Sequence, residues 1–322
     1  MTQDTNAKYR HNLPQLGDAV LLTDGGLETT LVFHDGLQLP YFAAFDLMRT
    51  QGGRKRLEDY YSLYAGIAAE KGVGFVLDTP TWRAHGDWGP LLGYSPEALE
   101  KVNRDAIAML MSLRERFEEP GRPHVVSGNI GPRGDGYDPE TLMEADEARE
   151  YHSAQVRTFA DAGADMITVM TMTHAGEAAG IASAAADAHI PVAISFTLET
   201  DGRLPTGQPL GDAIAETDSL SAAPPTYYMI NCAHPDHFRD AVSKGESWTR
   251  RIRGVRANAS RMSHAELDAS ETLDDGNPAE FGREHGELLA LLPNLRVFGG
   301  CCGTDHRHVH AVAETCCHRK AA

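Results

Sequence analysis

Strand-like and helix-like segments alternate along the whole of this chain of 322 residues. The strand-like segments are short apolar runs, which is typical of parallel strands covered on both faces. The segments between them carry apolar residues at helical spacing. This order of elements constrains the chain to an α/β fold with a parallel sheet. We expect strands at residues 20–23, 75–77, 124–132, 166–171, 192–196, 227–232, 252–256 and 296–301, and helices at 54–71, 96–117, 144–162 and 175–188.

Eight strands in this order predict a (β/α)8 TIM barrel, with a single domain at residues 19–322 after a polar N-terminal leader at 1–18. The alternative is a doubly wound open sheet, which needs a glycine-rich phosphate-binding turn after an early strand. The turn after the first strand, Asp24-Gly25-Gly26, lacks that pattern. The barrel is therefore the favoured fold.

Composition disfavours several classes of partner and compartment. The formal net charge of −17 opposes binding to nucleic acid or to anionic lipid, both of which need a basic surface. No apolar run approaches the roughly 20 residues that cross a bilayer, and the polar first 15 residues lack the apolar core of a signal peptide. The five cysteines are odd in number and four of them are adjacent pairs, which is no disulfide framework. We expect a cytoplasmic protein.

Three cysteines are placed to meet at one point. Cys301 and Cys302 follow the last strand, and Cys232 follows the sixth. Neighbouring side chains of a regular strand point to opposite faces, so both thiols reach one atom only if the backbone turns, which the flanking glycines permit. Barrel active sites lie at the C-terminal ends of strands, and one strand separates the sixth from the eighth. The sequence therefore predicts one metal site, with Cys316 and Cys317 as thiols outside it.

Three sulfur ligands select Zn²⁺ and leave one coordination position open, as in catalytic sites. A single cysteine is more often a small buried hydrophobe, and the set of three is what favours a metal. Zinc that already holds three thiolates is poor at making hydroxide, but it can remove the proton of an incoming thiol, whose free pKa is about 8.5. The chemistry this indicates is attack by a thiolate on a methyl group of a sulfonium or ammonium centre.

Three motifs of this chain are Asp24-Gly25-Gly26-Leu27-Glu28-Thr29, Asn231-Cys232, and Gly299-Gly300-Cys301-Cys302-Gly303-Thr304 with His308. Together they resemble the homocysteine S-methyltransferase family, the zinc enzymes that include betaine- and S-methylmethionine-dependent members. The resemblance runs from about residue 21 to residue 312 and implies a TIM barrel, zinc bound by the three cysteines, and transfer of a methyl group to homocysteine.

The same resemblance implies roles for the first turn. Asp24 matches the carboxylate that receives the amino group of homocysteine, and Gly25 and Gly26 match a turn whose amides lie near the substrate. We take Asp24 and Glu28 as the candidate catalytic carboxylates.

The resemblance also implies which residues approach the methyl donor, and these lie in the segment after the second strand. Thr79 and Trp82 stand where the family approaches the methyl donor. An aromatic face stabilises a methylated cation by roughly 0.5–2 kcal/mol, and core packing is the equally weighted alternative for Trp82.

The chain departs from the family after the fourth strand, where the family usually carries Glu-Thr and residues 169–173 read Val-Met-Thr-Met-Thr. The hydroxyl of Thr171 can accept a hydrogen bond but supplies no charge. We include Thr171 and Asn231 among the expected substrate-binding residues. Glu177 and Glu199 are the candidate substitutes for the missing carboxylate, although each is more typical of a solvated helix or loop residue.

The expected function is zinc-dependent methyl transfer from a small onium donor, first S-methylmethionine, to a thiol, first homocysteine, giving methionine. Betaine or another donor, and a different thiol acceptor, are the alternatives within this mechanism. A zinc hydrolase and a non-catalytic zinc-binding barrel are the alternatives outside it. The chain stops soon after the eighth strand, so we expect no cobalamin or folate domain. The sequence assigns no oligomeric state.

Overall fold

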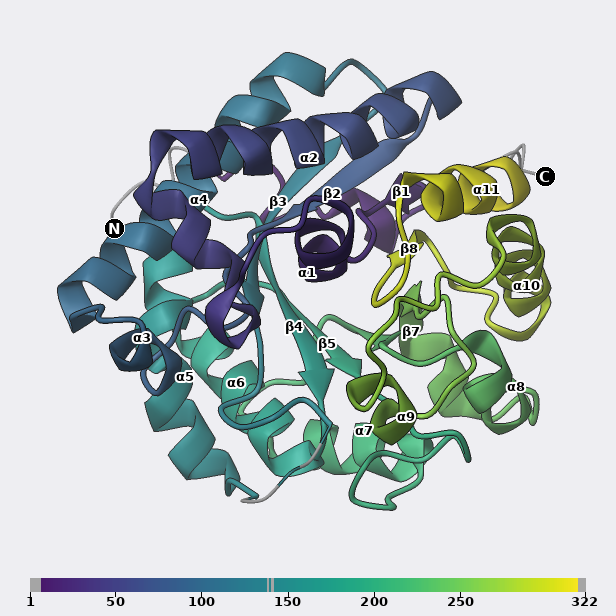
Figure 1. Cartoon of the computed structure of the whole chain (residues 1–322). Helices are drawn as coiled ribbons and strands as arrows, with labels where there is room; N and C mark the ends of the chain where they lie inside the picture. Colours follow the sequence, from purple (N-terminus) through teal and green to yellow (C-terminus); the bar gives the residue numbers. More distant parts are fainter. Residues whose placement is uncertain (1–6, 138, 140–141, 318–322) are drawn as a thin grey trace.

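Eight parallel strands close into a barrel in the order β1 to β8 (Figure 1). The structure is a computed structural model and describes residues 7–137, 139 and 142–317. Closure is made by β1, in which Leu21 lies opposite Gly74 of β2 on one side and Val297 of β8 on the other. The strands are β1 (Leu21–Leu22), β2 (Gly74–Asp78), β3 (His124–Ile130), β4 (Met166–Met172), β5 (Val192–Phe196), β6 (Tyr227–Asn231), β7 (Ile252–Ala257) and β8 (Val297–Gly300). The predicted TIM barrel is confirmed.

A ring of helices surrounds the strands, as Figure 1 shows. The predicted helix at 96–117 has the observed bounds, because Ser95 caps it by accepting a hydrogen bond from the Ala98 amide at 3.2 Å and Pro96 suits its first position. The main helices are α2 (Gln51–Lys71), α4 (Pro96–Phe117), α5 (Ala145–Asp161), α6 (Ala175–Asp187), α7 (Leu210–Leu220), α8 (Pro235–Val242), α10 (Pro278–Leu291) and α11 (His306–Cys316), and the short ones are α1 (Leu27–Thr29), α3 (Trp88–Leu91) and α9 (His264–Asp268).

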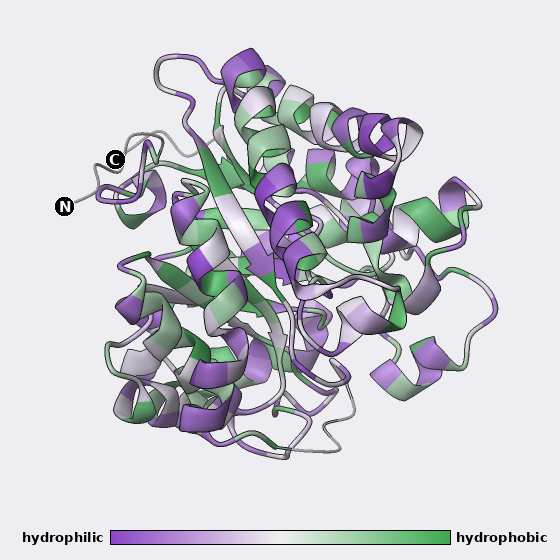
Figure 2. Ribbon diagram, turned by 90° about the vertical axis from the view of Figure 1, so that its left-hand side faces the viewer, coloured by the Kyte–Doolittle hydropathy of each residue, from purple (hydrophilic) through white to green (hydrophobic). Residues whose placement is uncertain are grey.

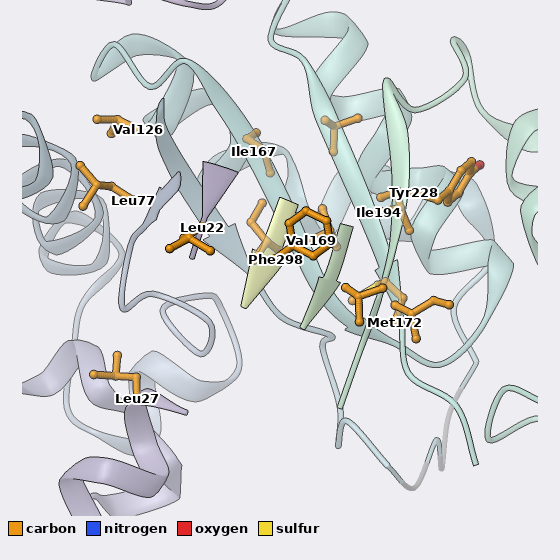
Figure 3. Packing of buried hydrophobic residues seen from close by; sticks show 14 of the residues in the cluster. Leu22, Leu27, Leu77, Val126, Ile167, Val169, Met172, Ile194, Tyr228 and Phe298 are labelled. Carbon is orange, nitrogen blue, oxygen red and sulfur yellow. The ribbon is translucent and has the colours of Figure 1, made fainter. Parts of the chain in front are cut away.

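Alternate residues of most strands belong to two separate cores. Leu21 and Val76 belong to the small cluster inside the barrel, whereas their neighbours Leu22 and Leu77 belong to the large cluster between strands and helices. Figure 3 shows side chains of the large cluster, and Figure 2 shows apolar strands inside a ring of helices with polar outer faces. Each such buried side chain contributes about 1.5–3 kcal/mol relative to an exposed one. The double burial explains why the strands are apolar on both faces.

The described part of the predicted leader lies against the N-terminal end of the barrel. Leu13 packs with the interior cluster, and the Gln15 side chain donates to the Tyr227 hydroxyl at 3.3 Å. Arg10 donates to the carbonyl of Ala164, just before β4. These contacts close the bottom of the barrel, and the division at residue 18 stays a prediction. None of the helices in the described ranges has the length and apolar character of a membrane span.

Candidate metal and substrate site

The three predicted ligands meet at the C-terminal ends of β6 and β8. The Sγ atoms of Cys232, Cys301 and Cys302 all lie within 4.8 Å of one another. We expected three free thiols, but the structure joins Cys232 and Cys301 as a disulfide with Cα atoms 5.5 Å apart, leaving Cys302 free. The difference has a simple physical reason, because two thiols placed for one metal ion are also close enough to bond to each other once oxidised. Zinc binding therefore requires the reduced pair.

Each of the three sulfur atoms has a hydrogen-bond donor beside it. The hydroxyl of Thr171 lies 4.0 Å from Sγ of Cys232, and the side-chain amide of Asn231 lies 3.9 Å from Sγ of Cys301. The Tyr137 hydroxyl lies 3.4 Å from Sγ of Cys302. Such partners orient ligands and stabilise the negative charge of thiolates. The donor set and its surroundings fit Zn²⁺, since soft sulfur ligands select this ion over the cations that prefer oxygen.

Burial raises the pKa of the Cys302 thiol, and the hydrogen bond from Tyr137 opposes that rise. A bound divalent cation reverses the effect of burial, because a coordinating thiol loses its proton outright. Thiolate formation at this position and metal binding are therefore linked.

Two residues at strand ends hold a backbone conformation that is rare for their type. Thr171, at the end of β4, has φ of 63°, and Cys232, directly after β6, has φ of 52°. The Asn231 side chain holds the first of them, accepting from the Thr171 amide and donating to its hydroxyl at 2.9 Å each. Asn231 also accepts from the Ser195 hydroxyl at 2.6 Å. Strained backbone of this kind is kept where the surroundings over-determine it, and here it aims two side chains at the sulfur cluster. Thr171 and Asn231 thus support the cysteine cluster, and their expected contact with substrate stays a prediction.

The turn after β1 is in direct contact with the segment that carries Cys301 and Cys302. A Cβ atom added at Gly26 would lie 2.6 Å from the carbonyl oxygen of Cys301, and one added at Gly300 would lie 2.0 Å from Oγ1 of Thr304. The amide of Gly26 donates to the backbone oxygen of Thr304 at 3.0 Å. The glycines therefore allow the turn after β1 to pack closely against the segment that carries Cys301 and Cys302. The Gly26 amide already has a hydrogen-bond acceptor within the protein.

A cavity of about 420 Å³ opens above the sulfur cluster, and the predicted site residues line it. Those residues are Asp24, Gly25, Gly26, Glu28, Thr79, Trp82, Thr171, Asn231, Cys232, Cys301 and Cys302. The structure thus brings every residue of the expected site to one cavity.

Asp24 is paired within the protein by an arginine that the sequence reading overlooked. Arg256, on β7, donates to Oδ1 of Asp24 at 2.6 Å and to Oδ2 of Asp78 at 3.0 Å. The hydroxyl of Tyr60 lies 3.1 Å from the other oxygen of Asp24. The side chains of Arg256, Asp24 and Asp78 are at most 9% exposed. Burial raises the pKa of Asp24 to about 6 while Arg256 opposes the rise, so the pair is ionised at neutral pH.

Glu28 differs from Asp24 in having no such partner. It lies on α1, near the centre of the ring of helices in Figure 1. Within the described chain it forms no ion pair, and the hydrogen bond that lowers its pKa comes from its own backbone. Burial is the dominant effect and raises the pKa of Glu28 to about 7. The cavity thus holds an acidic side chain whose charge the protein does not match.

Thr79 and Trp82, the two residues expected near the methyl donor, also have partners within the protein. The Thr79 hydroxyl accepts from the Asn129 amide at 2.9 Å. The indole nitrogen of Trp82 donates to the carbonyl of Met170 at 3.4 Å, and the guanidinium of Arg83 lies 4.4 Å from the Trp82 ring centre. One face of the indole is therefore covered by a cation of the protein. Two more aromatic side chains that line the cavity, Phe33 and Phe42, are about half exposed.

Neither candidate substitute for the missing carboxylate lies in the cavity. Glu177 was expected to be solvated, but it is 2% exposed, lies 2.9 Å from Nε2 of His152 and accepts from the Arg133 amide. The expectation failed because the alanine-rich helix α6 is buried on nearly all sides, a packing that charge alone does not reveal. Glu199 lies 3.0 Å from Nδ1 of His264, outside the cavity lining.

A second group of ligand-type side chains comprises His234, Asp236 and Glu284. The guanidinium of Arg261 forms ion pairs with Asp236, at 2.7 Å, and with Glu284. An arginine in contact with both carboxylates already balances their charge, so this group is an ion-pair cluster. Cys316 and Cys317 lie at the end of α11, apart from the cavity, as expected.

The residues that the sequence reading missed are Arg256, Tyr60 and Tyr137. An arginine inside the apolar strand Ile252–Ala257 was a signal for a buried charge pair, since arginine is almost never fully buried alone. Tyr60 was assigned only to a helical stripe. Tyr137 lies in a glycine-rich loop that carries no periodic signal.

Fold and site together define a TIM barrel with a cluster of three thiols at the C-terminal end of its strands. Residues 21–316 match the family described as homocysteine S-methyltransferase, and the chain belongs to this family.

Individual relatives are more distant. The chain is 26% identical over 231 residues to a protein named methionine synthase from Mycobacterium tuberculosis, and 27% identical over 242 residues to one of that name from Mycobacterium leprae. Each match covers 67% of this chain and 18% of the relative, so the chain spans less than a fifth of their length.

Among solved structures, the metallated form of the homocysteine methyltransferase MmuM from Escherichia coli superposes with a TM-score of 0.71 at 20% identity, covering 92% of this chain and 96% of that one. Its oxidized form gives the same TM-score at 22% identity, covering 92% and 95%. At these identities the likeness supports the fold alone.

Proposed function

We propose that this protein is a zinc-dependent S-methyltransferase that moves a methyl group from a small onium compound to a thiol, with homocysteine as acceptor and methionine as product. The observation that carries the proposal is the cluster of three sulfur atoms within 4.8 Å of one another at the floor of a cavity. Membership of the homocysteine S-methyltransferase family and the name methionine synthase carried by two relatives support this choice of acceptor and product.

Cys232, Cys301 and Cys302 would hold the zinc ion, which supplies a positive charge that keeps an acceptor thiol deprotonated at neutral pH. The protein does the rest by positioning. Thr171, Asn231 and Tyr137 fix the sulfur ligands, and the acidic wall formed by Asp24 and Glu28 faces the acceptor. Holding the two reactants in line replaces a bimolecular encounter and lowers the barrier without any acid or base at the carbon centre.

The donor is proposed to enter past the aromatic mouth of the cavity. Phe33 and Phe42 line the cavity with side chains that are about half exposed, and Trp82 and Thr79 line it with less exposed ones. Aromatic faces attract methylated cations, and acidic side chains balance their charge. S-methylmethionine is the proposed donor, with betaine or another small onium compound as the substitute. The requirement for reduced thiols makes the cytoplasm the proposed compartment.

The direct test is an assay for methionine on protein purified under reducing conditions. Zinc per chain is measured first, and methionine is then followed from homocysteine with S-methylmethionine, betaine or a dimethylsulfonium compound. We expect about one tightly bound zinc per chain at the three-thiol site and turnover with at least one onium donor, fastest with S-methylmethionine.

The same assay separates the other classes. Stoichiometric zinc with no turnover on any donor would favour a non-catalytic zinc-binding barrel. Release of a hydrolysed product without any thiol present would favour a zinc hydrolase, which the three-thiolate set disfavours because it is poor at making hydroxide.

A further inference from the structure

Of the lining carboxylates that are not exposed to water, one has no partner among the described residues. Asp24 and Asp78 share the guanidinium of Arg256, and Tyr60 lies beside Asp24. Both oxygens of Asp24 are therefore occupied by protein groups. An ammonium group arriving at Asp24 would have to share it with a buried arginine, which repels a second cation at short range.

Glu28 is the carboxylate of α1 that faces the same cavity. No side chain in the described ranges forms an ion pair or a hydrogen bond with it. At the rim, Asp274 accepts from the Ser260 hydroxyl at 2.6 Å. Asp268 also lines the cavity without an ion-pair partner among the described residues, but its side chain is exposed to water. Glu28 is partly buried, and a carboxylate held out of water without a cation costs free energy, which a bound ammonium group removes. Glu28 is thus built to receive a cation from outside the protein.

The position of α1 decides which substrate brings that cation. Residues on both sides of Glu28 contact the metal motif: Gly26 lies against the Cys301 carbonyl, and the Thr29 hydroxyl accepts from the Gly303 amide at 3.4 Å. The molecule whose sulfur occupies the sulfur cluster is the acceptor, so the cation that Glu28 meets belongs to the acceptor.

We infer that Glu28 binds the ammonium group of an amino-thiol acceptor and is the residue that makes the site specific for acceptors carrying that group. The inference rests on the proposed function. Asp24, held by Arg256, then shapes the turn that carries α1. Glu28 supplies the carboxylate that this chain lacks after β4.

The test uses zinc-loaded protein and two thiols that differ only in the ammonium group, L-homocysteine and 4-sulfanylbutanoate, with binding measured by titration calorimetry. Wild-type protein should bind homocysteine more tightly by about 10- to 100-fold, the range of a charge-assisted hydrogen bond. Glu28→Gln should remove most of this preference by weakening homocysteine alone, and Glu28→Asp should restore part of it. Glu115→Gln, an exposed change of the same charge on α4, should leave the preference intact.

The outcomes distinguish this inference from the proposed function. If Glu28→Gln retains zinc, the circular dichroism of the native fold and the full wild-type preference, Glu28 has no such role while the proposed function stands. If wild-type zinc-loaded protein binds neither thiol, the proposed function and this inference fail together. A loss of affinity for both thiols in Glu28→Gln would show a general effect on the site and would also overturn the specific role.

Discussion

Replacing Cys302 with alanine is expected to remove zinc and methyl-transfer activity together while leaving the barrel folded. Cys302 is the free thiol of the cluster and follows β8 in a loop that the barrel stabilises separately. Loss of a residue that merely supports a ligand costs about 10- to 100-fold in metal affinity, so loss of a ligand should cost more than about 100-fold. Zinc content, methionine formation and far-ultraviolet circular dichroism on the same sample measure the three quantities.

The matched control removes a thiol elsewhere. Cys317 lies just beyond α11 and outside the cavity lining, so Cys317→Ala should keep both zinc and activity. Full activity in a Cys302→Ala protein that holds no zinc would be incompatible with the proposed mechanism.

Replacing Arg256 with methionine is expected to lower the free energy of unfolding by about 3–5 kcal/mol at neutral pH. The change leaves the carboxylates of Asp24 and Asp78 buried without their shared cation. Urea denaturation at constant zinc measures the loss. The control Arg283→Met removes an exposed arginine that pairs with Glu280 on α10, and should cost no more than about 1 kcal/mol.

The pH dependence gives this prediction a definite sign. The folded-state pKa of Asp24 is raised from 3.8 to about 6, so the folded protein holds a proton that the unfolded chain has lost, and this group's contribution to stability falls as pH rises from about 4 to about 6. Without Arg256 the same window should extend upward. The stability loss of Arg256→Met should therefore be smaller at pH 5 than at pH 8, and a further change of Asp24 and Asp78 to asparagine should recover part of it. An equal loss at both pH values would show that packing alone is responsible.

Local patterns in the sequence were sufficient to predict the barrel and the meeting of three cysteine sulfur atoms. Strand residues such as Val192–Phe196 are buried on both faces, and this leaves a continuous apolar run that can be read directly. Cys232 and Cys301 follow β6 and β8, which both pair with β7, so the order of the strands alone brings the two cysteines close together.

The partners of buried charges could not be read in the same way. Asp24 follows β1, Asp78 ends β2 and Arg256 lies on β7. Only the closed barrel shows that the two carboxylates share one guanidinium. The rare backbone conformation of Thr171 depends on the Asn231 side chain, which comes from another strand. Nothing in the sequence of α6 shows that Glu177 is sealed against His152. Long-range pairing decides each of these cases.

The central claim is that three cysteine sulfurs hold one zinc ion and leave room for the sulfur of the acceptor. X-ray absorption at the zinc edge of reduced, zinc-loaded protein tests it most directly. Three sulfur neighbours at roughly 2.3 Å are expected without substrate, and a fourth after homocysteine is added. Two or fewer sulfur neighbours, or a spectrum that homocysteine does not change, would contradict the claim.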